Sequence, residues 1–282
     1  MTKPQHRRAL ISARDRAVSM VATGRSRLRS QRPLPDFIVA GVQKGGTTFL
    51  YQEMLRHPGV KGSLTKEVHF FDAHFDKGVD WYSGMFPRTS SNSKIVRGEA
   101  SPAYIFHPAG VRRIAETLPD ARLIVVLRDP VQRALSHYKH ERRLGFEESE
   151  TFEEALSLEE SRVSEEFDQL TEGVLSTSFA VGHFAYTRRG LYAQQLKRAA
   201  DLIGRDRLLI LISEEMFLDP IAARSAALEF VGAEPLDIAS VGDNDMAFRS
   251  EPMEASTEKA LREQFAAPNA ELAEFLGRDL PW

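Results

Sequence analysis

The stretch FIVAGVQKGGTT, residues 37–48, joins a short apolar run to a glycine-rich turn and two threonines. Residues 37–42 are predicted to form a buried strand, and residues 47–57, with Leu50 and Met54 one turn apart, a helix. Glycines let backbone N–H groups close around an anion, and the first turn of a helix adds the positive end of its dipole. We therefore expect a strand–turn–helix unit that binds a phosphate-like group.

The lysine of this turn is displaced from the position that it takes in nucleotide-cleaving P-loops. Gly41 and Gly46 have the separation of the pattern G-x-x-x-x-G-K-[ST], but Thr47 stands where the lysine belongs, and Lys44 lies inside the turn. In a nucleotide hydrolase, the lysine and the following Ser/Thr serve the β- and γ-phosphates and Mg²⁺. The alternative is a tight turn that merely needs glycine. The predicted anion-binding residues are Gln43, Lys44, Gly45, Gly46, Thr47 and Thr48.

The composition is that of an ordinary globular protein. The chain has 282 residues, of which 42% are hydrophobic and 27% charged, and this suits one α/β domain or at most two small ones. A net charge of −3 gives no general case for nucleic-acid binding. Because the chain has no cysteine, disulfides, thiolate zinc sites and cysteine nucleophiles are excluded. No apolar stretch approaches the ~20 residues of a transmembrane helix, so no membrane-spanning segment is expected.

Residues 1–35 form a basic N-terminal extension that differs from the rest of the chain. Up to Arg32 it carries nine lysines and arginines against one acid, Asp15. It lacks the long apolar core of a secretory signal, and residues 9–21 are predicted to be partly helical. Two interpretations stay open: a solvated extension, or a weak contact with an anionic membrane surface or an acidic partner. The expected location is the bacterial cytoplasm, either free or peripheral at the membrane.

Strands and helices alternate along residues 36–282, which are predicted to form a single doubly wound α/β domain with a central parallel sheet flanked by helices. Further strands are expected at residues 94–97, 122–127 and 207–212. Further helices are expected at residues 108–118, 130–143, 191–203, 220–231 and 254–276, the last broken at Pro268. The acidic stretch 146–171 is expected to be helical in part.

Three polar stretches directly follow predicted strands: residues 43–48, 99–104 and 128–133. In an open parallel sheet, ligands bind beyond the carboxyl ends of the strands. The three stretches are therefore expected to converge on one site.

A second anion site is predicted in LIVVLRDPVQRALSHY, residues 123–138. Arg128 ends the strongest predicted strand, and Arg133 and Ser136 are three residues apart, hence neighbours on one helix face. An arginine fork with a serine hydroxyl suits a terminal phosphate dianion. The alternative for Arg128 is a surface salt bridge with a nearby acid.

The two motifs together resemble those of the PAPS-dependent sulfotransferases, in which PAPS is 3′-phosphoadenosine-5′-phosphosulfate. K-G-G-T-T after a strand is similar to the 5′-phosphosulfate loop of that family, and R-D-P-x-x-R-x-x-S to its 3′-phosphate motif, whose first arginine and serine correspond to Arg128 and Ser136. The resemblance favours the heparan-sulfate N- and 3-O-sulfotransferases and their bacterial relatives. It extends through KEVHFFD (66–72), KGVDWYSGMFP (77–87), GEASPAYIF (98–106) and LLILISEEMFLDP (208–220).

This resemblance implies a P-loop-like sulfotransferase domain over residues 36–282. It implies transfer of the sulfuryl group from PAPS to a hydroxyl or an amine, release of 3′,5′-ADP, and no obligatory metal. In-line positioning and charge stabilisation would carry the catalysis. The acceptor stays open between a glycan, a glycolipid or other lipid-linked molecule, and a small natural product.

Sulfuryl transfer needs a base near the acceptor and a cation near the departing phosphate oxygen, and Lys44 suits the second role. For the base, Glu67 and His69 are predicted on one side of an extended segment. The resemblance assigns the base to Glu67, because heparan-type enzymes carry a glutamate in the context E-x-H-F-F; His69 stays the alternative. Lys66 is a candidate for orienting the sulfonate. A base that works near neutral pH would have a pKa raised by burial.

Other candidates rest on the resemblance alone. Glu99 and Tyr104 are candidates for lining the acceptor cleft, and Ala100 stands where the family often has a lysine. The family also closes a basic loop over the 3′-phosphate. The candidates for that loop are Arg188, Arg189 and Arg249.

Two other functions are weighed against sulfuryl transfer. A small-molecule kinase or NTPase with a variant P-loop would need a lysine directly before Thr47, which is absent, and an acidic Mg²⁺ ligand after a strand, for which Asp129 is the obvious candidate. A non-catalytic module that binds PAPS or sulfate would not need both Lys44 and Glu67.

Overall fold

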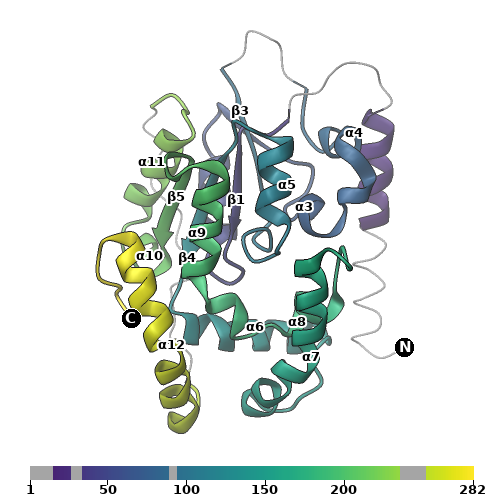
Figure 1. Cartoon of the computed structure of the whole chain (residues 1–282). Helices are drawn as coiled ribbons and strands as arrows, with labels where there is room; N and C mark the ends of the chain where they lie inside the picture. The colour runs from purple at the N-terminus through teal and green to yellow at the C-terminus, as the bar shows by residue number, and fades with distance from the viewer. Residues whose placement is uncertain (1–14, 27–33, 89–93, 236–251) are drawn as a thin grey trace.

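The computed structural model describes residues 15–26, 34–88, 94–235 and 252–282. Within these residues five parallel strands form one sheet in the order β2-β3-β1-β4-β5 (Figure 1). The strands are β1 (Phe37–Gly41), β2 (Val60–Gly62), β3 (Val96–Ala100), β4 (Arg122–Leu127) and β5 (Leu208–Ile212). The predicted doubly wound α/β class with a central parallel sheet is confirmed.

Helices connect the strands and cover both faces of the sheet (Figure 1). They are α2 (Thr47–Leu55), α3 (Phe70–Ala73), α4 (Gly78–Ser83), α5 (Gly110–Thr117), α6 (Pro130–Leu144), α7 (Phe152–Glu172), α8 (Phe179–Phe184), α9 (Tyr192–Ile203), α10 (Ser213–Leu218), α11 (Pro220–Phe230) and α12 (Ala255–Leu276). Short 3₁₀ turns lie at η1 (Phe75–Lys77), η2 (Arg188–Gly190) and η3 (Arg205–Arg207). Residues 15–26 are also helical and lie beside α4.

Strand β4 shows why the sheet is apolar on both faces. Its residues Leu123, Val125 and Leu127 are buried in the cluster formed with α3, α4, α5 and α9. The alternate residues Ile124 and Val126 are buried in the cluster formed with α2, α10 and α11. A parallel strand with helices on both sides loses both faces to the interior, so an unbroken apolar run replaces alternation.

The helices α6, α7 and α8 gather at one end of the sheet (Figure 1). Helix α6 begins at Pro130 because the Asp129 carboxylate accepts a hydrogen bond from the Val131 N–H over 2.9 Å, and proline suits the first helical position. Gly145, in the left-handed region at φ 77°, ends it. Helix α8 packs against α7, so this end of the sheet has an additional layer.

The structure departs from the predictions in several elements. Strand β2 and helices α3, α4, α8 and α10 were not predicted, because segments of three to six residues leave little periodicity to detect. Helix α12 continues through Pro268, so the predicted break is wrong: a helix tolerates proline where neighbouring packing holds it. Of the predicted helix at residues 9–21, residues 15–21 are helical and the rest lie outside the described part of the chain.

In the described parts of the chain, no helix combines the length and the apolar character that a bilayer crossing requires.

Gly98 gives a test of the packing between β3 and β1. A Cβ atom at this position would lie 2.2 Å from Cζ of Phe37 on the neighbouring strand. We expect Gly98→Ala to lower the free energy of unfolding by about 1–3 kcal/mol, since the ring has to move within a packed core. Urea denaturation measures this. The control Gly24→Ala, with no neighbour within 4 Å of the new Cβ, should be neutral or mildly stabilising.

Candidate functional site

The turn between β1 and α2 has the geometry of an anion cradle. Gly46 has φ 91° and precedes the first residue of α2, and Lys44 has φ 69°. The Gly45 N–H donates to the Val42 carbonyl over 2.9 Å. A Cβ on Gly45 would lie 2.3 Å from the Val126 carbonyl oxygen of β4, so only glycine fits. Thr47 is buried and Thr48 half-buried at the start of the helix.

Lys44 lies where cations and carboxylates meet. Burial and the guanidinium groups of Arg143 and Arg128 lower the pKa of Lys44, while the carboxylates of Glu141 and Glu67 oppose this effect. Nη1 of Arg128 donates to the Lys44 carbonyl over 3.2 Å, which joins the turn after β1 to the turn after β4. A bound anion would relieve the repulsion among these three cations.

Ser136 lies half-buried on α6, and Arg128 lies half-buried at the end of β4. Arg133, three residues before Ser136, does not join them. Its side chain is fully buried and donates to the Tyr186 carbonyl. The expected arginine–serine pair on one helix face is therefore not formed by Arg133, and the residues left for a phosphate dianion are Arg128 and Ser136.

Asp129 has a structural role in this turn. Its carboxylate caps α6 and also lies 3.1 Å from Nη2 of Arg262 in α12. The Asp129 N–H donates to the Glu214 carboxylate over 3.0 Å. These contacts use the oxygens that a Mg²⁺ ligand would need, which disfavours the kinase or NTPase alternative.

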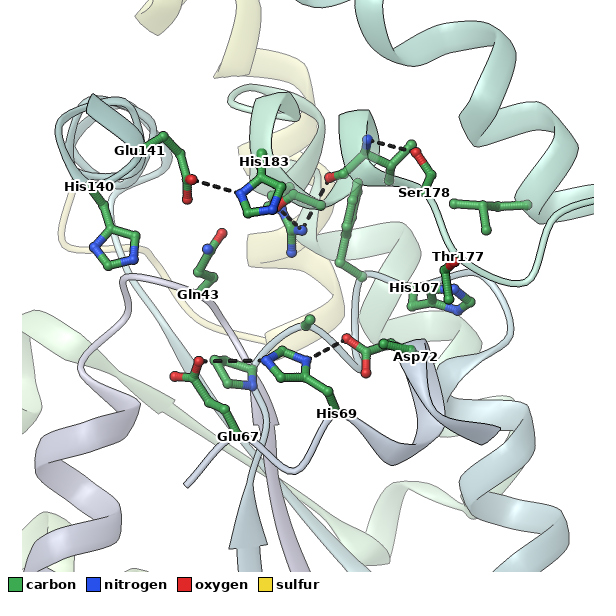
Figure 2. Close-up of a pocket in the computed structure, with 18 of the residues that line it drawn as sticks. Gln43, Glu67, His69, Asp72, His107, His140, Glu141, Thr177, Ser178 and His183 are labelled. Carbon is green, nitrogen blue, oxygen red and sulfur yellow. Dashed lines mark hydrogen bonds and ion pairs between the residues drawn. The ribbon is translucent and has the colours of Figure 1, made fainter. Parts of the chain in front are cut away.

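Glu67, His69 and Asp72 form a line of polar side chains beside the anion cradle (Figure 2). Oε2 of Glu67 lies 3.6 Å from Nε2 of His69, and Nδ1 of His69 lies 2.8 Å from Oδ2 of Asp72. Nζ of Lys66 contacts Oε1 of Glu67. The Glu67 side chain keeps 44% of its surface exposed, so its carboxylate is accessible from the cavity described below.

The charges of this line stabilise one another. Burial favours a neutral His69, but the charge and hydrogen bond of Asp72, together with Glu67, raise the pKa of His69 well above its usual value. Burial favours a neutral Glu67, but His69 and Lys66 outweigh it and lower the pKa of Glu67 to about 2. The pKa of the proposed base is thus lowered, whereas a base that works near neutral pH would have a raised one. The two cations, Lys66 and His69, are neighbours of Glu67 in the sequence, but their contact with its carboxylate depends on the local backbone.

The predicted extended backbone at Glu67 and His69 is also wrong, although the two side chains do lie close together. Glu67 and His69 have φ 63° and 53°, in the left-handed region. The Glu67 N–H donates to the Ala100 carbonyl over 2.9 Å, and the His69 N–H donates to Oγ of Ser101 over 3.2 Å. These bonds to the end of β3 hold the strained turn and aim both side chains at the cavity.

Glu99 and Tyr104 are buried beneath the site and do not line it. Both side chains are 0% exposed. The Glu99 carboxylate accepts hydrogen bonds from Tyr82 and Tyr104 over 2.5 and 3.1 Å and from Ser101 over 2.7 Å, and burial raises the pKa of Glu99. Since Ser101 in turn accepts from the His69 N–H, this network supports the line of Glu67, His69 and Asp72 from below. The expectation that Glu99 and Tyr104 contact the acceptor is therefore corrected.

A cavity of about 360 Å³ opens beside the line, and its far wall comes from α6 and α8 (Figure 2). Oε2 of Glu141 lies 2.8 Å from Nδ1 of His183, and Oε1 lies 3.4 Å from Nε2 of His137. Burial raises the pKa of Glu141, but the two histidines outweigh it and lower the pKa to about 2. Gln43 of the cradle reaches into the space between the two walls.

Three arginines were predicted to close over the 3′-phosphate, and the two that the structure describes have other partners. Nη2 of Arg188 contacts Glu160 and Ser164 of α7 over 3.0 and 2.6 Å. Arg189 lines the cavity, but its Nη2 donates to the carbonyls of α8 and its guanidinium lies over the Phe106 ring. These contacts give no support to a role on the 3′-phosphate for either arginine. Arg249 lies outside the described residues.

Several residues of the site were missed by the sequence analysis. Asp72 stands within KEVHFFD, three residues after His69, and the spacing would have paired them had α3 been predicted. Glu141 and His183 are 42 residues apart, and no local pattern connects them. Within the described residues, no group of three or more His, Cys, Asp and Glu side chains could hold a metal ion; metal independence stays a prediction.

The charge of His69 gives a direct test of this geometry. In wild type we expect the His69 ring to stay protonated at neutral pH, because its pKa is raised. Asp72→Asn should lower its titration midpoint by about one to three pH units, the effect of removing one close carboxylate. NMR of the histidine rings measures this. The control Asp76→Asn, at an exposed position on η1, should leave the His69 midpoint unchanged. A wild-type midpoint near 6.5 would contradict the arrangement.

Comparison with known proteins agrees with the fold and the motifs. The family model of the sulfotransferase domain matches residues 34–258. The heparan sulfate glucosamine 3-O-sulfotransferase 6 of Mus musculus is 32% identical over 212 residues, which cover 75% of this chain and 55% of that protein. The membrane-associated sulfotransferase kil1 of Dictyostelium discoideum is 43% identical over 107 residues, which cover 37% of this chain and 22% of that protein.

A solved structure is similar over most of the chain. The crystal structure of a sulfotransferase from Alicyclobacillus acidocaldarius matches with a TM-score of 0.71 and 28% identity, covering 88% of this chain and 98% of that one. The chain spans about half the length, or less, of the two curated relatives above. Because the family model covers most of the chain and the fold agrees, this chain belongs to the sulfotransferase family.

Proposed function

We propose that this protein transfers the sulfuryl group of PAPS to a hydroxyl or an amine of its acceptor and releases 3′,5′-ADP. One observation carries the proposal: Lys44 lies in a glycine turn that is bonded to Arg128, and this turn borders a cavity lined by Glu67, His69 and Asp72. An anion cradle and a charged acid–base line thus share one edge of the sheet, as group transfer between two substrates requires.

The residues of the cradle fit the donor. The backbone of Gly45 and Gly46, the hydroxyls of Thr47 and Thr48 and the ammonium of Lys44 suit the 5′-phosphosulfate. Arg128 and Ser136, beyond the neighbouring strand β4, suit the 3′-phosphate. The glycines are required because a side chain at Gly45 would collide with β4. Lys66, next to Glu67, is proposed to orient the sulfonate.

The acid–base line supplies the proton transfer. Glu67 accepts the proton of the acceptor hydroxyl or amine as the new bond to sulfur forms and the bond from sulfur to the phosphate oxygen breaks. Lys44 stabilises the negative charge that develops on that oxygen. His69, held by Asp72, fixes the carboxylate of Glu67. A base with a lowered pKa is ionised throughout the neutral range, so it removes the proton only once attack has begun to acidify the acceptor.

The alternatives are less well supported. A kinase or NTPase would need a free acid near the phosphates, and the Asp129 carboxylate is held by Val131 and Arg262. A non-catalytic binding module would have no use for the ordered line of Glu67, His69 and Asp72. A glycan, glycolipid or natural-product acceptor, a metal-free reaction and a cytoplasmic location, free or in contact with the membrane through the basic extension, belong to the proposal.

The donor site is tested by isothermal titration calorimetry with 3′,5′-ADP and, separately, with ATP and Mg²⁺. Wild type should bind 3′,5′-ADP more tightly than ATP with Mg²⁺. Arg128→Ala and Lys44→Ala should each weaken 3′,5′-ADP binding by about tenfold or more, because each removes a charge-assisted contact worth about 1.5–3 kcal/mol. The control Arg112→Ala, at an exposed site on α5, should leave the affinity unchanged. Preference for ATP with Mg²⁺ and indifference to the 3′-phosphate would contradict the proposal.

The base is tested by Glu67→Gln, which keeps the shape and removes the charge. We expect the rate of 3′,5′-ADP formation from PAPS and acceptor to fall by about 10²–10⁴-fold, the usual contribution of a general base. The affinity for 3′,5′-ADP should stay within about twofold of wild type, because Glu67 does not belong to the proposed donor site. Full activity of Glu67→Gln would show that Glu67 is not the base. His69 would then be the next candidate.

A further inference from the structure

We propose that the acceptor is a compact molecule that is uncharged or cationic, and that sulfated polysaccharide chains are excluded. This inference rests on the proposed function and specifies its acceptor. It differs from the acceptor in the name of the Mus musculus relative, heparan sulfate. Four features carry it: the size of the cavity, its apolar wall, its polar atoms and the acidic charge of helix α7 beside it.

The cavity is small. Its volume of about 360 Å³ lies at the low end of the range for small-molecule sites. Thr177, Ser178, Val181 and Gly182, from the segment that begins α8, line it, and so do Pro102 and Ala103. A polymer needs a groove that is open at both ends, whereas this cavity suits a single compact group.

One wall of the cavity is apolar. It is formed by Phe106, Leu144, Leu170 and Val181, which come from four different segments. Phe106 and Val181 are buried together with Leu170 in the cluster between α7 and α8. An apolar wall opposite a few polar groups is typical of sites for small organic molecules, and it gives no contact to a chain of sulfated sugars.

Two of the cavity-wall atoms that lack a hydrogen bond in the described structure are oxygen acceptors, and Nε of Arg189 also lacks one. Oε1 of Gln43 and Oδ1 of Asp72 are buried in the cavity wall without a hydrogen bond in the described structure. Burial and nearby arginines lower the pKa of His107, another lining residue, to about 4, so this ring is neutral at physiological pH. The two oxygen acceptors suit the hydroxyl or ammonium groups of an acceptor.

One arginine and no lysine line the cavity within the described residues. Among the described lining residues Arg189 is the one such side chain, and it is buried, with Nη2 donating to the Val181 and Gly182 carbonyls. Three carboxylates face the cavity: Glu67, Asp72 and Glu141. The charge of His69 is already shared between the first two.

Helix α7, which contributes Leu170 to the cavity, is strongly acidic. It contains eight acidic residues and a single basic one, Arg162. Glu166 bonds to Ser178 at the cavity wall over 2.5 Å, so this charge reaches the site itself. A polyanion that approached along α7 would be repelled, and a local field of one sign changes association strongly.

The first test compares acceptors with the full-length protein and PAPS. Formation of 3′,5′-ADP is followed with neutral alkyl and aryl glucosides, phenols and amino alcohols, and with heparan sulfate and chondroitin sulfate. We expect at least one compact probe to react with a kcat/KM about 100-fold above that of either polysaccharide, a difference of about 2.7 kcal/mol. Comparable or faster reaction of a polysaccharide would overturn the proposal, and so would a panel in which no compact probe reacts.

The second test changes only the charge of α7. The exposed residues Glu165, Asp168 and Glu172 are replaced together by lysine, and a matched control carries Gln, Asn and Gln at these positions. A heparan sulfate oligosaccharide should show no saturable binding to wild type with 3′,5′-ADP, detectable binding to the neutral control, and about tenfold tighter, salt-sensitive binding to the lysine variant. In both variants, turnover of the best compact probe should stay within about twofold of the wild-type value. Tight binding of the oligosaccharide to wild type would overturn the proposal.

The two proposals fail in different ways. Absence of 3′,5′-ADP binding to wild type would overturn the proposed function itself. Intact 3′,5′-ADP binding with preferential sulfation of a polysaccharide would leave the function in place and overturn only the inference about the acceptor.

Discussion

The hydrogen bond from Arg128 to the Lys44 carbonyl joins two turns that lie 84 residues apart in the chain. It can form because β1 and β4 are neighbours in a parallel sheet, so that both strands end at the same edge. The turn after β1 approaches β4 so closely that only glycine fits at position 45. The anion cradle, the catalytic line and the cavity are all arranged around this junction.

Opposite charges meet at Lys44. Arg128 and Arg143 lower its pKa, and the carboxylates of Glu67 and Glu141 raise it. The carboxylates are themselves held by histidines, which lower the pKa values of both Glu67 and Glu141 to about 2. Both walls of the cavity therefore keep fixed negative charge at neutral pH. This arrangement separates a region that suits an anionic donor from one that suits an uncharged or cationic acceptor.

The layer formed by α6, α7 and α8 lies on the side of the proposed acceptor. Its helices line the cavity, contribute the pair of Glu141 and His183, and bring the acidic surface of α7 close to the site. The donor side depends on the glycine turn and on the end of β4. The two substrates would thus be recognised by separate parts of the fold, so the acceptor can differ between relatives that share the same donor motif.

Much of the fold and of the donor site could be predicted from the sequence, because these depend on local patterns. The apolar runs of β1 and β4, the glycine spacing and the order of strands and helices are all contained in short segments. The pairing of Glu67 with His69 was predicted too, but from an extended geometry that the left-handed turn replaces. The positions of Arg133, Glu99 and Tyr104 were not predictable, since burial depends on what packs over a residue.

The sequence by itself determined an α/β domain with an anion-binding turn and a second basic turn. Only the tertiary structure decided that Asp72 joins Glu67 and His69 in the proposed catalytic line, that Glu141 and His183 face it, and that acidic α7 flanks the cavity. The physical reason is distance: a glycine turn is specified by neighbours in the chain, whereas the charge and shape of a cavity arise from segments brought together by packing of the core.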